Sequence, residues 1–181
     1  RTTVCSLVIK GYGMILAIDG FNAIYKFPDL EEKMYRGEIE GACRGLLELL
    51  FALKKKWKKP LEIHVFFDGK KKKGDLTTRE KAGDLHVYYS LDMSADYHIK
   101  EFIKSRHSPG EIRVVSSDKD VAYFAKKAKC HSQSSEEFAV WVDEVLHEKK
   151  LKEVEVKPDM KSGDLDFWKK MFSRSPGSDK R

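Results

Sequence analysis

Few cysteines and no long apolar run are the first features of this sequence, and each absence excludes a class of protein. The three cysteines lie far apart in a chain of 181 residues: Cys5, Cys43 and Cys130. An odd number without paired spacing argues against a disulfide framework and against a zinc site. We therefore expect free thiols in a reducing cytoplasm. No membrane span is expected, because Lys10 and Asp19 interrupt the best candidate run.

Histidine is also scarce, and its placement excludes further chemistry. The six histidines are scattered, without the spacing of zinc ligands. No Ser-His or Cys-His pair can be identified from spacing as a nucleophile and its base. A zinc enzyme and a covalent hydrolase of this kind are therefore disfavoured.

The composition is that of one soluble globular domain with a basic charge. Hydrophobic residues make up 41% of the chain and charged residues 35%, which is enough for one sizeable core. We expect the domain over residues 14–149. Residues 1–13 form an extension without a signal-peptide pattern, and residues 150–181 form a charged, largely flexible tail. The net charge of +6 favours a polyanionic partner.

Three apolar runs are each followed by polar residues that include an acid. Runs of this length are typical of strands buried on both faces of a parallel sheet. Three strands are predicted on this basis: 14–18, 61–67 and 112–115. They lead into Asp19, Asp68 and Asp118. In open α/β sheets, ligands bind outside this carboxyl edge of the strands.

Amphipathic patterns between the strands predict helices. The further predicted elements are a helix over 39–57, a strand over 85–89, a helix capped by Ser94, a helix from Ser117 or Asp118, a short strand near 129–132 and a helix after a capping box of Ser134 and Glu137. Residues 23–33 are expected to be irregular, because Pro28 breaks any long helix. Alternating strands and helices indicate an α/β fold with a central, mainly parallel sheet.

This order of elements brings five carboxylates to one edge of the predicted sheet. Asp19, Asp68 and Asp118 follow strands, whereas Asp96 and Asp120 lie in first turns of helices. Each acid alone could be a helix cap or a turn residue. Capping does not explain Asp19 and Asp68 at the ends of buried strands. Several carboxylates in one place need a cation, and Mg²⁺ or Mn²⁺ prefers oxygen ligands of this kind.

A lysine-rich loop follows the second strand. Its basic residues are Lys70, Lys71, Lys72 and Lys73, with Arg79 and Lys81 shortly after. Gly69 and Gly74 imitate an ATP-binding loop, but Asp75 and Leu76 stand where that loop needs lysine and a hydroxyl. Four lysines beside an acidic edge favour contact with a phosphate backbone over a solvated loop.

Carboxylates that hold one or two Mg²⁺ or Mn²⁺ ions beside such a loop suit the hydrolysis of a phosphodiester, because the ion activates water and offsets charge on the phosphate. The nearest alternative is an RNA-binding module with the same fold and little catalysis. A phosphohydrolase with an aspartyl nucleophile is disfavoured, since Phe21 stands where that enzyme needs a second acid. The residues do not distinguish RNA from DNA, and they do not indicate the oligomeric state.

Four short motifs, in their order and spacing, carry a resemblance to a known family. They are Ile18-Asp19-Gly20-Phe21-Asn22, Phe67-Asp68-Gly69, Ser94-Ala95-Asp96 and Ser116-Ser117-Asp118-Lys119-Asp120. Together they resemble the YacP-like NYN domain family, within the PIN-like nuclease superfamily, over residues 14–148. The resemblance implies a PIN-like α/β/α sandwich. It also implies a cytoplasmic, divalent-metal-dependent ribonuclease that cuts single-stranded RNA, including mRNA on ribosomes.

The same resemblance implies roles for individual residues. Asp19, Asp96 and Asp118 match the family's metal-binding acids, and Asn22 matches the amide after the first acid. Asn22 would position a metal-bound water or a phosphate, because an amide is not a strong base. Asp68 is a further candidate ligand. Asp120 fits the wider PIN pattern but not the YacP-like one, so its role as a ligand, a partner of a ligand or a helix-start residue stays open.

Overall fold

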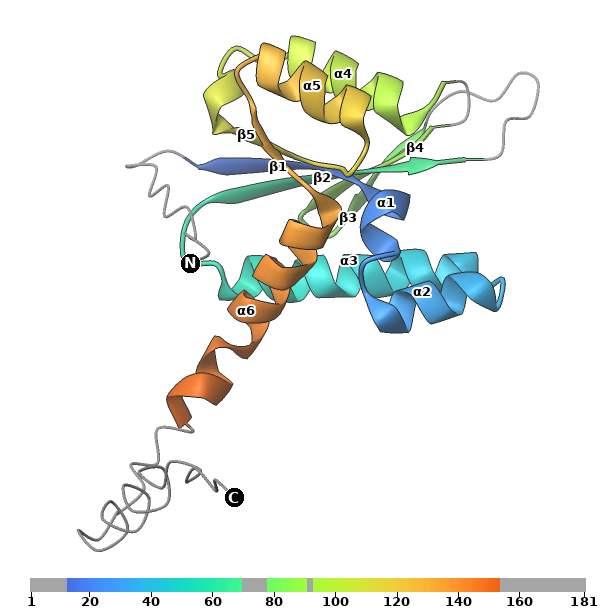
Figure 1. Ribbon diagram of the computed structural model, residues 1–181, viewed down its shortest axis with the longest axis vertical. Coiled ribbons are helices and arrows are strands. Elements are labelled where there is room, and N and C mark those ends of the chain that lie inside the picture. The colour runs from blue at the N-terminus through green and yellow to red at the C-terminus, as the bar shows by residue number, and fades with distance from the viewer. Residues whose placement is uncertain (1–12, 70–77, 91–92, 154–181) are drawn as a thin grey trace, which may run out of the picture. The chain divides into compact units, whose positions relative to one another are not determined.

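A six-stranded sheet lies at the centre of the first of two compact units, residues 1–146 and 147–181. The computed structural model describes residues 13–69, 78–90 and 93–153 (Figure 1). The strands are β1 (Met14–Asp19), β2 (Leu61–Asp68), β3 (Thr78–Ala82), β4 (Leu85–Ser90), β5 (Ile112–Val115) and β6 (His131–Gln133). Their order is β3-β4-β2-β1-β5-β6, and only β3 is antiparallel to its neighbour.

The two central strands are the apolar runs that the sequence predicts as strands. Leu16, Ala17 and Ile18 of β1 have no exposed surface, and residues 63–67 of β2 are equally buried. A strand that is covered by helices on both faces must be apolar at successive positions, which is why neither run alternates with polar residues. Register pairs Asp19 with Phe66, so both strands reach the same edge of the sheet.

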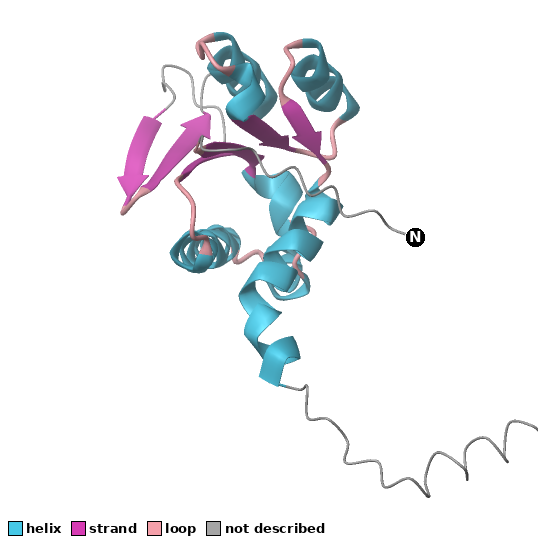
Figure 2. Ribbon diagram, turned by 90° about the vertical axis from the view of Figure 1, so that its left-hand side faces the viewer, coloured by secondary structure: helices cyan, strands magenta, loops and turns pink. Residues whose placement is uncertain are grey.

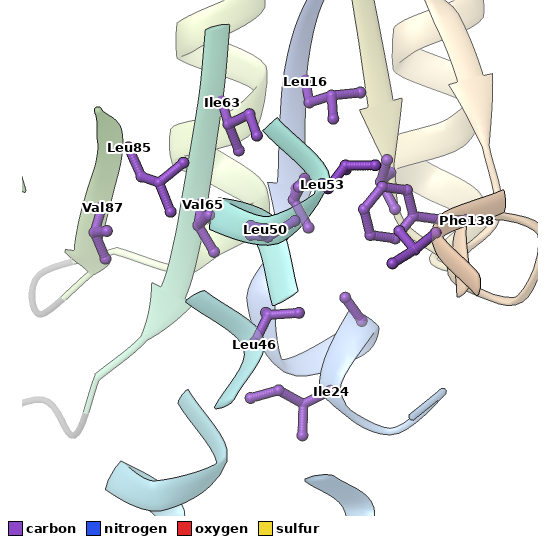
Figure 3. Close-up of a cluster of buried hydrophobic side chains, with 14 of the residues drawn as sticks. Leu16, Ile24, Leu46, Leu50, Leu53, Ile63, Val65, Leu85, Val87 and Phe138 are labelled. Carbon is purple, nitrogen blue, oxygen red and sulfur yellow. The ribbon is translucent and has the colours of Figure 1, made fainter. Parts of the chain in front are cut away.

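Three helices, and the part of a fourth that belongs to the first unit, lie on one side of the sheet (Figure 1). They are α1 (Gly20–Ile24), α2 (Pro28–Tyr35), α3 (Ile39–Lys56) and α6 (Ser135–Glu153). Helix α3 places Leu46, Leu50 and Leu53 at helical spacing against Leu16, Ile63 and the other inward residues of that face (Figure 3). Phe138 of α6 belongs to the same cluster. Packing of this apolar stripe therefore holds α3 on the sheet.

Two helices cover the opposite face, α4 (Ala95–Lys104) and α5 (Lys119–Lys127). A short 3₁₀ turn, Pro109–Glu111, leads into β5. The core on this side includes Ala17, Phe66, Ile99 and Val121. Because β1 contributes Leu16 and Ile18 to one cluster and Ala17 to the other, the protein is a three-layer α/β/α sandwich. The predicted fold class is confirmed.

Most predicted elements are confirmed, with two exceptions. The prediction of an irregular segment over 23–33 is wrong, because α1 ends and α2 begins there. Pro28 occupies the first position of α2, where its missing N–H needs no partner. Strand β3 was not predicted, because its sequence, TREKA, has no apolar alternation. No helix in the described part of the chain is long and apolar enough to cross a membrane.

The strand order reverses its direction between β1 and β5. After β1 the chain turns to α1 on one face, and after β5 it turns to α5 on the other (Figure 1). Neighbouring parallel strands whose connections leave toward opposite faces create a crevice at their carboxyl ends. The acidic motifs after β1 and β5 therefore lie at the position where α/β proteins bind ligands.

Candidate active site

Asp19 ends β1 and also caps the first turn of α1. Its Oδ1 accepts a hydrogen bond from the backbone N–H of Asn22 (3.2 Å), and its Oδ2 accepts one from the hydroxyl of Ser116 (3.2 Å). The residue is only 7% exposed. Burial is the main cause that raises the pKa of Asp19 to about 6, and the charges of Asp96 and Asp68 act in the same direction. The two hydrogen bonds oppose this shift without cancelling it.

Gly20 allows α1 to begin directly on the sheet. A Cβ at this position would lie 2.3 Å from Cε1 of Phe67, closer than real atoms approach. The ring of Phe67 also packs edge-on against Phe21, with 5.4 Å between ring centroids. The glycine of the first motif is therefore required by close packing, and this packing holds Asp19 and Asn22 on one short turn.

Asp68 and Asp96 meet where β2 ends and α4 begins. Oδ1 of Asp68 accepts a hydrogen bond from the backbone N–H of Ala95 (2.6 Å), and Ser94 caps the same helix through the N–H of Tyr97 (3.3 Å). Asp68 thereby fixes the start of the helix that carries Asp96. Burial raises the pKa of Asp96, as do the nearby charges of Asp118, Asp68 and Asp120, while Lys100 lowers it.

Asp118 caps α5 with one of its two carboxylate oxygens. Oδ1 accepts hydrogen bonds from the backbone N–H groups of Asp120 (2.8 Å) and Val121 (3.0 Å). The backbone N–H of Asp118 donates to Oγ of Ser116 (3.1 Å), whose hydroxyl donates to Asp19. The buried Ser116 therefore links the two acids that follow β1 and β5. Asp120 itself is exposed in the first turn of α5.

The structure thus places all five predicted acids at one edge, where their charges influence one another. None of them forms an ion pair with a lysine or arginine among the residues described here. Burial without an ion pair from the described residues leaves negative charge at this edge that those residues do not neutralise. Carboxylate oxygens are hard ligands, so this donor set fits a divalent cation such as Mg²⁺ or Mn²⁺.

Asn22 faces this edge but uses its side-chain oxygen within the protein. Its Oδ1 accepts hydrogen bonds from the backbone N–H of Ser117 (3.3 Å) and from the hydroxyl of Ser135 (3.2 Å). Ser135 is fully buried at the start of α6. The amide oxygen of Asn22 therefore joins α1, the loop after β5 and α6, which leaves the amide NH₂ as the group for the predicted contact with water or phosphate.

A second set of contacts supports this junction, and the sequence did not reveal it. The hydroxyl of Ser117 donates to Glu136 (2.5 Å), and the Lys26 ammonium pairs with the other oxygen of Glu136 (2.8 Å). These two partners lower the pKa of Glu136 to about 2. The backbone N–H of Ser135 also donates to Oγ of Ser117 (3.0 Å). Only the capping box of α6, in which Ser134 and Glu137 exchange hydrogen bonds, was predicted and is confirmed.

The predicted basic residues are only partly described. Lys70, Lys71, Lys72 and Lys73 lie outside the described residues. Arg79 and Lys81 lie on β3, where both side chains are exposed. Their register partners on β4 are Tyr88 and His86.

A different cluster, of mixed acid and histidine, lies near the amino ends of the strands. In the described part of the chain, only one group of three His, Cys, Asp or Glu side chains has all its ligand atoms within 4.8 Å of one another: Glu62, His64 and His86. Glu62 accepts hydrogen bonds from Nε2 of His64 (2.5 Å) and from Arg106 (3.0 Å). The Arg106 guanidinium therefore already supplies the positive charge that a metal ion would bring here.

Both ring nitrogens of His64 have hydrogen-bond partners within the protein. Because a carboxylate only accepts, Nε2 carries the proton that is donated to Glu62, and Nδ1 lies 3.0 Å from the hydroxyl of Tyr88. Burial lowers the pKa of His64 to about 4, although Glu62 opposes the shift. His64 is therefore a neutral, buried hydrogen-bonding residue, and the sheet edge with the carboxylates is the better candidate for a metal site.

Comparison with solved structures agrees with this fold. Rae1 (YacP) from Bacillus subtilis superimposes with a TM-score of 0.58 and 18% identity, covering 87% of this chain and 90% of that one. A tryptophan-to-leucine mutant of the same protein gives a TM-score of 0.57, again at 18% identity, over 91% of this chain and 86% of the other. At this identity the likeness concerns the fold. No curated protein matches the chain.

A family model decides the relationship at the level of sequence. The model for the YacP-like NYN domain matches residues 16–172, which is most of the chain and includes all five acids and Asn22. The chain therefore belongs to the YacP-like NYN domain family, a nuclease-type family.

Proposed function

We propose that this protein is a divalent-metal-dependent endoribonuclease that hydrolyses phosphodiester bonds of single-stranded RNA. Its membership of a nuclease-type family supports hydrolysis, and an NYN domain suggests RNA as the partner. The observation that carries the proposal is the state of Asp19: it is buried, its pKa is raised to about 6, and it feels the charges of Asp96 and Asp68. A site built in this way is suited to a cation and to phosphate chemistry.

Asp19, Asp96 and Asp118 are the proposed ligands of one or two Mg²⁺ or Mn²⁺ ions. When bound, such an ion supplies a Lewis acid that activates water and offsets the charge of the phosphate. Asp118 uses only Oδ1 to cap α5, so its second oxygen remains for a ligand. Asp68 and Asp120 are exposed, unlike Asp19, Asp96 and Asp118, so we assign them supporting roles.

The neighbouring polar residues hold the acids in place. Ser116 donates to Oδ2 of Asp19 and accepts from the backbone of Asp118, which sets the separation of the strand ends that carry them. Asn22 ties the turn after Asp19 to the loop after β5. Rigid positioning of this kind is what a hydrolytic site needs, because small displacements of the reacting groups reduce the rate. Asn22 is catalytic in this proposal through its amide NH₂, as a donor to water or phosphate.

The substrate would be held by basic residues. Arg79 and Lys81 are proposed contacts of the phosphate backbone, together with Lys70, Lys71, Lys72 and Lys73. An mRNA on the ribosome, in the cytoplasm, is the substrate that we propose for the cell. The net charge of +6 supports a polyanionic substrate, although it does not distinguish among RNAs.

The deciding experiment is cleavage of a labelled single-stranded RNA by the full chain. Wild type, Asp19→Asn and Asp29→Asn are each tested in EDTA, Mg²⁺ and Mn²⁺, with binding measured in parallel. Asp29 is an exposed acid of α2 away from the carboxylate edge, so its variant controls for the loss of one charge. We expect cleavage by wild type and Asp29→Asn only when metal is present, and none by Asp19→Asn.

Cleavage that persists in EDTA, or in Asp19→Asn, would contradict the metal-site assignment. RNA binding without cleavage in every condition would favour the other candidate, an RNA-binding module that keeps the NYN fold without catalysis. Binding and cleavage of single-stranded DNA at the same rate would contradict the restriction to RNA.

A further inference from the structure

One face of the two outer strands carries exposed and partly exposed side chains among the described residues. Strands β3 and β4 form an antiparallel pair at the edge of the sheet, to one side of helix α4 (Figure 2). Arg79 and Lys81 of β3 pair in register with Tyr88 and His86 of β4, so the four side chains share the face on the side of α4. We call these four residues the hairpin face. Arg79 and Lys81 are exposed, and the two rings are partly exposed.

The side chains of the hairpin face are ordered by contacts with one another. The Arg79 guanidinium donates to Nδ1 of His86 (3.3 Å) and lies 5.5 Å from the centroid of the Tyr88 ring. The His86 ring stacks on the buried His64 ring, with 4.6 Å between centroids and 14° between planes. Tyr88 stacks on Phe66 in the same way, at 4.6 Å and 9°. The rings are therefore held rigidly by the core beneath them.

The charge of this surface is positive. Arg79 and Lys81 are exposed cations beside the His86 ring; burial lowers the pKa of His86, and the charges of Arg79, Lys81 and Lys54 act in the same direction. The charge of Glu62 opposes this shift, but Arg106 pairs with Glu62 at 3.0 Å, and the exposed Asp84 in the turn between β3 and β4 pairs with Lys54 at 4.0 Å. Cations next to flat, partly exposed rings are the combination with which proteins bind single-stranded nucleic acid.

Strand β4 runs from the hairpin face to the carboxylate edge, where it ends at the buried Ser90. Ser90, at the end of β4, pairs in register with Asp68. At the usual rise of a strand, the row of Tyr88 and Arg79 lies about 7 Å from Ser90, and the row of His86 and Lys81 about 13 Å. A chain that leaves the acids along β4 would therefore meet first one row and then the other.

We propose that the hairpin face is a substrate subsite that holds the single-stranded RNA on one side of the cleaved bond. Arg79 and Lys81 contact successive phosphates, and a base packs against the exposed part of the His86 ring. The inference deepens the proposed function and rests on it. It adds His86 and Tyr88, which no sequence motif indicated, and it assigns the residues of β3 to a particular path for the substrate.

Binding is tested in EDTA, where the proposed enzyme does not cleave, so that affinity is measured apart from catalysis. The full chain is titrated with a short, labelled single-stranded RNA at several salt concentrations, and fluorescence anisotropy reports the Kd. The variants are Arg79→Ala/Lys81→Ala and, as a control with the same loss of charge, Lys126→Ala/Lys127→Ala. Lys126 and Lys127 are exposed in the last turn of α5, which starts at the acidic edge and ends away from it.

We expect the Arg79→Ala/Lys81→Ala variant to bind the RNA about tenfold more weakly than wild type. The slope of log K, where K is the association constant, against log salt should be less steep by about 1.4, which is the value for two lost phosphate contacts. The control should change both quantities much less. In a second pair, His86→Ala should weaken binding about tenfold, whereas His86→Phe, which keeps a flat ring, should stay within about twofold of wild type. Circular dichroism checks that each variant is folded.

Equal effects of the two double variants would overturn the proposal, and so would equal binding by His86→Ala and wild type. Cleavage in Mg²⁺ or Mn²⁺ separates this failure from that of the proposed function. A wild type that cleaves RNA while the Arg79→Ala/Lys81→Ala variant keeps its KM refutes the subsite alone. A wild type that binds RNA through the hairpin face but never cleaves it refutes the proposed function alone.

Discussion

The raised pKa of Asp19 predicts that this acid destabilises the metal-free protein at neutral pH. In the folded state its pKa is about 6, compared with 3.8 for an ordinary aspartate. Below pH 3.8 both states are protonated, and the carboxyl has no effect. As the pH rises toward 6, the unfolded chain ionises first, so the folded state loses stability. Above pH 6 the loss is complete and amounts to about 3 kcal/mol.

Replacement by asparagine removes this titration. Asp19→Asn keeps an oxygen that can accept the N–H of Asn22, although the hydrogen bond from Ser116 changes. That change shifts the stability of the variant by a constant amount, whereas the effect of the carboxyl depends on pH. The difference in free energy of unfolding between variant and wild type should therefore move in favour of the variant by about 1.5 kcal/mol between pH 5 and pH 8.

Urea denaturation in EDTA at pH 5, 6, 7 and 8 measures this difference, with Asp29→Asn as the control for a lost exposed charge. Added Mg²⁺ should then raise the melting temperature of wild type at pH 8 more than that of Asp19→Asn, since only the wild type keeps the buried carboxylate. Parallel pH profiles for wild type and Asp19→Asn in EDTA would refute the reasoning, because they would mean that Asp19 ionises in the folded protein as it does in the unfolded chain.

Three further predictions concern the support of the site. Gly20→Ala should lower the free energy of unfolding in urea by about 1–3 kcal/mol, because its Cβ would overlap Phe67. Gly41→Ala in α3 is the control and should not destabilise the protein, because a Cβ at Gly41 meets nothing closer than 3.8 Å. Asn22→Ala should cost about 1–3 kcal/mol by removing the acceptor of buried Ser135, and a double-mutant cycle with Ser135→Ala should show coupling. Burial lowers the pKa of His64 to about 4 in the folded protein, so the unfolded chain takes up a proton at this residue first as the pH falls from 6.5 to 4. The free energy of unfolding should therefore decrease over this pH range, and His64→Gln should make that decrease smaller.

The sequence predicted the elements whose signal lies in their own residues. The apolar runs of β1 and β2 are recognisable because both faces of these strands are buried. Strand β3 has no such signal, since Arg79, Glu80 and Lys81 are all exposed and the strand pairs only with β4. Helix α1 is also hidden, because a five-residue helix that begins at Gly20 is defined by the close approach to Phe67. Short elements that depend on tertiary contacts escape a local pattern.

The same distinction applies to the site. That the acids converge could be predicted, because parallel strands end at one edge. How they are held could not, because the partners are distant in sequence: Ser116 bonds Asp19, and Asp68 bonds the backbone of Ala95. The contact between Asn22 and Ser135 spans 113 positions and depends on the docking of α6. A motif therefore indicates which residues meet, but it does not indicate which of their atoms already have hydrogen-bond partners within the protein.

Hydrogen bonds and ion pairs within the protein also explain why the two clusters at opposite ends of the same sheet differ in chemistry. At the amino ends, Glu62 receives the guanidinium of Arg106 and the Nε2 proton of His64, so its charge is compensated within the protein. At the carboxyl ends, Asp19 and Asp96 receive no ion pair from the described residues, and burial together with neighbouring carboxylates raises the pKa of each. A cation therefore gains more at the second cluster, although the first has its ligand atoms closer together. Compensation of charge, more than proximity of ligands, is therefore the reason that we place the proposed metal site at the carboxyl ends of the strands.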